Sequence, residues 1–111
     1  MNTQKTQVVN TIREYFNTFD SASGKENKAN ILCSIYEYID THFDYIRSNE
    51  FDPNKRFITT VHEKCIEHKT ELDGISSSLQ ETLYRILDRV QWKCAEQLNI
   101  PTAVPVSIYN L

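Results

Sequence analysis

The sequence predicts an all-α protein, an antiparallel four-helix bundle with an extended C-terminal tail packed on the last helical hairpin. Apolar residues recur at helical spacing along four successive stretches of the chain. Only two glycines and three prolines interrupt the 111 residues, and no long stretch alternates apolar and polar residues as a strand would. We expect the bundle to span residues 1–100 and the tail to span residues 101–111.

The first helix is expected from about Thr3 to Phe19. A polar connection follows at residues 20–24, and Ser23 with Glu26 forms a capping-box pattern that predicts the start of the next helix. The apolar face of the first helix consists of Val8, Val9, Ile12, Tyr15, Phe16 and Phe19.

The second helix is expected to be the longest, from Gly24 to Asn49. Its core face consists of Leu32, Ile35, Tyr36, Ile39, Phe43 and Ile46. One flank carries the acidic residues Glu37, Asp40 and Asp44, which a solvated surface explains. The other flank carries Ile31, Tyr38, His42 and Tyr45. This second flank is either a broadened core against a neighbouring helix or a strip that binds a partner, because tyrosine is enriched at interfaces.

The third helix is expected to begin at Asp52-Pro53, with the aspartate as N-cap and the proline in the first helical position. Its apolar side consists of Phe57, Ile58, Val61, Cys65, His68 and Leu72. Gly74 lies where a left-handed C-terminal cap would fall. The connection to the next helix is therefore short, which predicts an antiparallel hairpin of the last two helices.

The fourth helix, Ser76 to Asn99, is the element around which the others are expected to pack. Its continuous apolar stripe consists of Leu79, Leu83, Ile86, Leu87, Val90, Cys94 and Leu98. Two overlapping capping boxes, Ser77 with Gln80 and Ser78 with Glu81, predict its start. Pro101 predicts its end, because the residue before a proline is disfavoured in helical geometry.

Trp92 is expected to project almost opposite this stripe, beside Arg85 and Arg89. A tryptophan open to water is unusual, so either the tail or a partner protein is expected to cover it. The tail cannot continue the helix, yet it is apolar, with Val104, Val106, Ile108, Tyr109 and Leu111. The basic line of Arg85, Arg89 and Lys93, beside Glu81 and Glu96, predicts a salt-bridged face.

Catalytic, cofactor and metal sites are not expected. His62-Glu63 begins like a zinc-protease helix, but Ile66 stands where the second histidine belongs. The three cysteines fall on predicted core faces, so they predict buried free thiols in a reducing compartment rather than disulfides or nucleophiles. The formal net charge of −3 gives no basic field for nucleic acid.

The chain contains no apolar run long enough to cross a membrane and begins with no signal-peptide core, so a soluble cytoplasmic protein is expected. His68 lies within an apolar face of the third helix. It is interpreted as a core histidine with a hydrogen-bond partner, and alternatively as a pH-sensitive or ligand-contacting group.

The layout from Glu50-Phe51-Asp52-Pro53 through Leu87, with the tail Pro101 to Leu111, resembles the cytoplasmic immunity proteins of pediocin-like (class IIa) bacteriocins. The features that carry the resemblance are a proline-started third helix, the polar end Glu67-His68-Lys69-Thr70, and a leucine-rich fourth helix. The resemblance implies a four-helix bundle whose last hairpin and tail recognise a toxin or a toxin-bound receptor inside the producing cell.

We therefore expect a non-enzymatic immunity or inhibitor protein that needs no cofactor and binds a protein partner such as a toxin or bacteriocin, as a monomer or homodimer. The alternative is a helical regulatory or structural module that dimerises or binds a partner through the tyrosine strip of the second helix. The candidate partner-binding residues are Tyr38, His42, Tyr45, Arg85, Arg89, Trp92, Val106, Ile108 and Tyr109.

Overall fold

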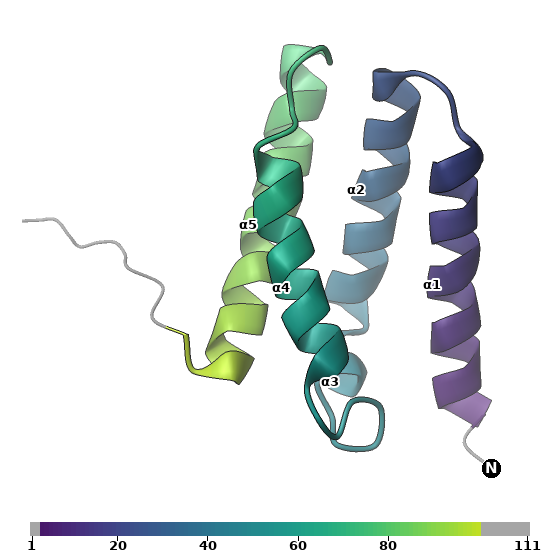
Figure 1. Ribbon diagram of the computed structural model, residues 1–111, viewed down its shortest axis with the longest axis vertical. Helices are drawn as coiled ribbons and strands as arrows, with labels where there is room; N and C mark the ends of the chain where they lie inside the picture. Colours follow the sequence, from purple (N-terminus) through teal and green to yellow (C-terminus); the bar gives the residue numbers. More distant parts are fainter. Residues whose placement is uncertain (1–2, 101–111) are drawn as a thin grey trace, which may run out of the picture.

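A computed structural model describes residues 3–100, which form five helices and no strand. In chain order the helices are α1 (Thr3–Ser21), α2 (Lys25–Thr41), α3 (Phe43–Ile46), α4 (Arg56–Lys69) and α5 (Ser77–Leu98). The expectation of an all-α protein is confirmed. The four long helices run alternately up and down, with α3 as a single turn at the end of α2 (Figure 1).

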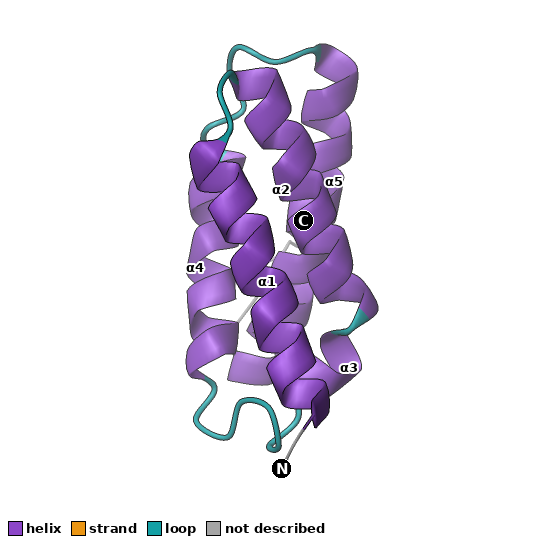
Figure 2. Ribbon diagram, turned by 90° about the vertical axis from the view of Figure 1, so that its right-hand side faces the viewer, coloured by secondary structure: helices purple, strands orange, loops and turns teal. Residues whose placement is uncertain are grey.

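The helix α5 is the central element of the packing. It makes its most extensive contacts with α4 and with α2, while α1 packs mainly on α2 (Figures 1 and 2). The predicted stripe of α5 is buried from Leu83 to Cys94, as its helical spacing required. Tyr36 on α2 and Ile58 on α4 are also buried almost completely, so the centre of the core lies between these three helices, and Val8 and Ile12 of α1 extend it.

The expected second helix is interrupted at His42, so the prediction of one helix from Gly24 to Asn49 was wrong. His42 has φ −101° and ψ 18° and ends α2, and both its backbone N–H and its ring Nδ1 lie within hydrogen-bond distance of the Tyr38 carbonyl oxygen. The chain resumes as α3, whose Phe43 and Ile46 are buried. The apolar spacing therefore identified the core residues correctly although the helix does not continue through them.

Asp52 is a capping residue, but it does not occupy the N-cap position. Helix α4 begins at Arg56, after Lys55 in the left-handed conformation at φ 57°. The buried Asp52 carboxylate accepts hydrogen bonds from the backbone N–H groups of Phe57 at 3.1 Å and Ile58 at 3.0 Å. The predicted start of this helix at Asp52-Pro53 was therefore too early by three to four residues.

The other predicted helix ends also shift by a few residues. The N-cap of α5 is Ser76, whose hydroxyl accepts from the Leu79 N–H, rather than Ser77 or Ser78. Gly74 is left-handed at φ 89°, but it lies in the loop beyond the Thr70 C-cap of α4. The capping box of Ser23 with Glu26 does not form.

The N-cap of α2 is Gly24, which makes no side-chain cap. Glu26 instead accepts a hydrogen bond from the backbone N–H of Ser76 at the start of α5. This contact ties the α1–α2 and α4–α5 connections together at one end of the molecule.

Candidate functional site

Trp92 lies on the outward face of α5, where 50% of its surface is exposed. At about 100° per residue, Arg85, Asp88 and Glu96 fall within about 40° of Trp92 around the helix axis. A large aromatic side chain thus lies among charged neighbours on a rigid helix. The position opposite the apolar stripe is the one that the sequence predicted for Trp92.

Tyr84 and Ile66 are the other large apolar side chains that the α4–α5 hairpin leaves substantially exposed, at 47% and 45%. Neither was among the predicted site residues. Tyr84 contacts the Lys69 ammonium, which lies 4.8 Å from the ring centroid and also pairs with Asp88 at 2.8 Å. The signal that could have found Tyr84 is its position two turns before Trp92, outside the apolar stripe of the same helix.

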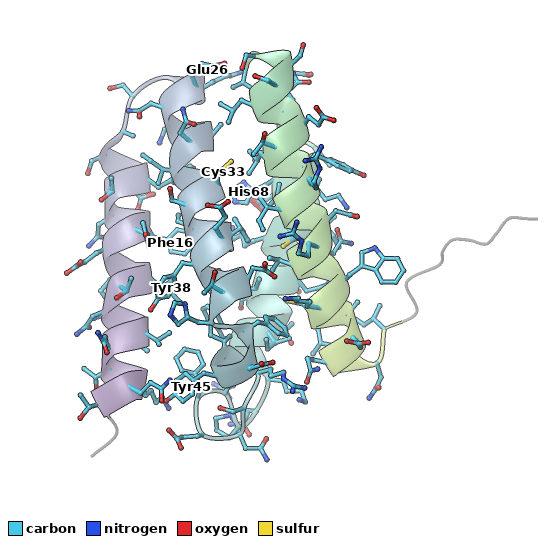
Figure 3. All side chains as sticks on the ribbon, turned by 180° about the vertical axis from the view of Figure 1, so that it is seen from behind. Phe16, Glu26, Cys33, Tyr38, Tyr45 and His68 are labelled. Carbon is cyan, nitrogen blue, oxygen red and sulfur yellow. The ribbon has the colours of Figure 1, made fainter. Side chains whose placement is uncertain are left out.

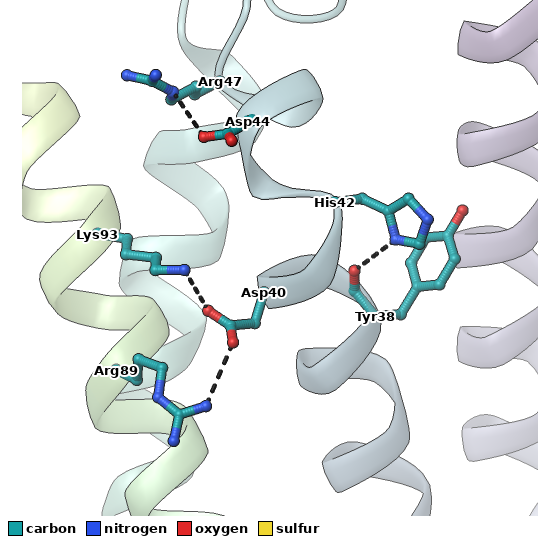
Figure 4. Close-up of polar contacts among 7 residues, drawn as sticks. All are labelled: Tyr38, Asp40, His42, Asp44, Arg47, Arg89 and Lys93. Carbon is teal, nitrogen blue, oxygen red and sulfur yellow. Dashed lines mark hydrogen bonds and ion pairs between the residues drawn. The ribbon is translucent and has the colours of Figure 1, made fainter.

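Arg89 and Lys93 connect α5 to α2 rather than to acidic residues of their own helix. Both pair with the half-buried Asp40 carboxylate, Arg89 at 3.2 Å and Lys93 at 2.6 Å (Figure 4). Arg85 pairs with Glu81 at 3.1 Å, as a salt-bridged face predicts. The prediction that the acidic flank of α2 is a solvated surface is therefore wrong at Asp40, because this carboxylate joins α2 to α5.

The tyrosine strip of the second helix is partly occupied by packing within the chain. Tyr38 stacks on His42 with ring centroids 4.1 Å apart (Figure 4). The ring centroid of Tyr38 also lies 5.9 Å from that of Tyr15 on α1. Tyr45 packs on Phe51 at 5.5 Å. All four residues of the strip, Ile31, Tyr38, His42 and Tyr45, are half-buried. These contacts favour the broadened core over an open partner strip.

Three candidate partner-binding residues, Val106, Ile108 and Tyr109, lie outside the residues that the structure describes. The same holds for the expected docking of the tail on Trp92. Of the predicted site, the structure therefore places Trp92 and the two arginines on α5, Tyr38 on α2, His42 between α2 and α3, and Tyr45 on α3 (Figure 3).

His68 lies in the interior between two aromatic rings. Its ring centroid is 6.3 Å from that of Phe19 and 6.1 Å from that of Tyr36, and both pairs are edge-to-face. Burial lowers the pKa of His68 below its ordinary value of 6.5, although Glu71, with a carboxylate oxygen 3.6 Å from Nδ1, works in the opposite direction. Burial in the folded protein therefore disfavours the protonated imidazole.

We expect His68 to make the protein less stable as the pH falls below about 6.5. The unfolded chain binds a proton on this histidine at a higher pH than the folded chain does, so acidification favours unfolding through this residue. Urea unfolding at pH 7.5 and at pH 5.5 measures how much the free energy of unfolding falls on acidification, for the natural protein and for His68→Phe. The variant should lose less stability than the natural protein between pH 7.5 and pH 5.5. An equal loss in both proteins would contradict the assignment to His68.

Burial makes the thiolate form of all three cysteines less favourable. Burial raises the pKa of Cys94 to about 12 and that of Cys65 further still, and it also raises the pKa of the half-buried Cys33. Within residues 3–100, no group of three or more histidine, cysteine, aspartate and glutamate side chains is arranged to hold a metal ion.

Among helices α1 to α5, none has an apolar segment of the length that crossing a bilayer requires. Comparisons with protein-family models, with curated protein sequences and with solved structures find no significant match for this chain.

Proposed function

We propose that this chain is a non-enzymatic immunity or inhibitor protein that protects its cell by binding a bacterial toxin, a bacteriocin or a toxin-bound receptor. The observation that carries the proposal is the half-exposed Trp92 on the outward face of α5. Trp and Arg are the residues most enriched at the energetic centre of protein interfaces. On α5 a tryptophan lies beside Arg85 and Arg89 on one rigid element, which suits recognition of another protein.

In this proposal the four long helices form the bundle, and the last hairpin α4–α5 presents the binding surface. Tyr84 and Ile66 are also exposed on this hairpin, and the proposal assigns them to the same binding surface. Residues 101–111 contribute the remaining contacts through Val106, Ile108 and Tyr109, as the resemblance to class IIa bacteriocin immunity proteins implies.

The proposal is tested by expressing the chain in a bacterium that pediocin-like bacteriocins kill and measuring the inhibitory concentration of a panel of them. Protection by the natural protein against at least one member is expected. Trp92→Ala should remove most of it, because truncation of a central interface residue costs about 2 kcal/mol or more, roughly 30-fold in affinity.

Arg13→Ala is the matched control, because this exposed side chain lies on α1, outside the proposed hairpin surface, and donates to Asn10 of its own helix. It should protect as well as the natural protein. Deletion of residues 104–111 separates the two parts of the proposed surface, and should also reduce protection. Folded natural protein that protects against no bacteriocin of the panel would contradict the class IIa assignment, and full protection by Trp92→Ala would contradict the proposed surface.

A further inference from the structure

The α1–α2 and α4–α5 connections lie at the same end of the molecule (Figure 1). Residues of both connections and of the adjoining helices line a cavity of about 400 Å³. Its apolar wall consists of Phe19, Ala29, Leu32, Ile75 and Leu83, and its polar lining consists of Lys25, Lys28, His68, Glu71 and Asp73. Small-molecule sites have this character, with mostly apolar walls and a few polar groups that fix the orientation of the ligand.

The two lysines at this cavity have no carboxylate partner among the described residues. The Lys28 ammonium donates to the Phe19 carbonyl oxygen at 2.8 Å and lies 4.4 Å from the centroid of the Phe19 ring. The Lys25 ammonium donates to the Asp73 carbonyl oxygen at 3.3 Å. Because an ammonium has three donors and these acceptors are uncharged, both lysines can bind an anion more strongly than their present partners.

The acidic side chains at the cavity are more exposed than Lys28. Glu71 lies beside His68, and 61% of its side chain is open to solvent, while Asp73 is also exposed. Lys28 is half-buried against the aromatic wall. Since solvent weakens exposed charges more than partly buried ones, Lys28 dominates the field felt by a ligand in the apolar part of the cavity.

We propose that this cavity binds a small amphiphilic carboxylate, such as a medium-chain fatty acid. The apolar chain lies against Phe19, Leu32 and Leu83, and the carboxylate lies at Lys28 and Lys25. An apolar cavity of about 150 Å³ holds one benzene molecule, so the present volume has room for a chain of about ten carbons. The proposal is independent of the toxin-binding surface around Trp92.

Isothermal titration calorimetry of the full chain at pH 7.5 tests this site with three probes that share one chain length. These are decanoate, decanol and decyltrimethylammonium, each kept below its critical micelle concentration. Decanoate is expected to bind saturably, with one molecule per chain, and most tightly of the three. Tighter binding of decyltrimethylammonium, or no saturable binding of decanoate, would overturn the proposal.

Lys28→Gln separates the charge contribution from the apolar one. Loss of a charge-assisted hydrogen bond should weaken decanoate binding about tenfold or more, while decanol binding stays nearly unchanged. Arg13→Gln, at an exposed position of α1 that does not line the cavity, is the matched control and should bind decanoate like the natural protein. Equal decanoate affinity for Lys28→Gln and the natural protein would overturn the assignment of the carboxylate to Lys28.

Ala29→Leu tests the cavity itself, because the larger side chain takes up space at its apolar wall. This variant should lose binding of both decanoate and decanol while keeping the circular dichroism of the natural protein. Undiminished binding by the folded variant would show that the probes bind elsewhere. If Ala29→Leu does not fold, Ile75→Trp makes the same test from the α4–α5 loop, where Ile75 is only half-buried.

Discussion

Leu87→Ala is expected to lower the free energy of unfolding by about 2–5 kcal/mol. Leu87 is completely buried on α5, the helix that packs on both α2 and α4. Truncation removes apolar burial and leaves a cavity that cannot collapse easily, because helices constrain it from two sides. A loss of this size is a large part of the total stability of a small domain, which is about 5–15 kcal/mol.

Urea unfolding followed by circular dichroism at 222 nm measures this loss, and Thr82→Ala is the matched control on the same helix. Thr82 is exposed, and its hydroxyl only bonds back to the Ser78 carbonyl oxygen. Its replacement should change the stability by no more than about 0.5 kcal/mol. A loss below about 1 kcal/mol for Leu87→Ala would show that α5 is not the centre of the packing.

The helices and the core residues could be predicted from the sequence because both depend on apolar periodicity, which is local. Leu83, Leu87 and Val90 are buried as their spacing required. The break at His42 could not be predicted in this way. Phe43 and Ile46 continue the same periodic pattern. They are buried after the interruption, and the same spacing would bury them in a continuous helix, so the pattern does not distinguish the two.

The exposed part of the candidate site was predictable for the same reason, since Trp92 lies opposite the apolar stripe. The ion pairs were less predictable. Arg89 was expected beside acidic residues of its own helix, but it pairs with Asp40, 49 positions earlier in the chain. The cavity at the α1–α2 end is formed by five segments, so only the folded arrangement brings Lys28 and His68 to one site.

The start of α4 shows how far a capping residue can predict where its helix begins. An aspartate before a proline is a typical N-cap pattern, and Asp52 does bind the start of α4. The intervening residues make an additional turn, however, with Lys55 in a left-handed conformation that nothing in its own identity requires. The residue that caps the helix was therefore predictable, and the loop between cap and helix was not.

Asp52→Ala is expected to destabilise the protein by about 1.5–3 kcal/mol. The Asp52 side chain accepts from two backbone N–H groups, those of Phe57 and Ile58, at the positive end of α4. Asp52 is only 6% exposed, so its replacement by alanine leaves these two N–H donors without an acceptor at a place that water reaches poorly. Buried N–H groups without an acceptor cost more than the net value of the hydrogen bonds that they lose.

Two further variants show whether this loss belongs to the capping contacts. Asp52→Asn keeps one acceptor oxygen and should lose about half as much stability, since one of the two N–H groups stays paired. Asp44→Ala removes an aspartate of α3 whose side chain is 98% exposed and pairs with Arg47, so it should be close to neutral (Figure 4). Similar losses for Asp44→Ala and Asp52→Ala in urea unfolding would show that net charge, rather than the two backbone contacts, sets the stability of this end of α4.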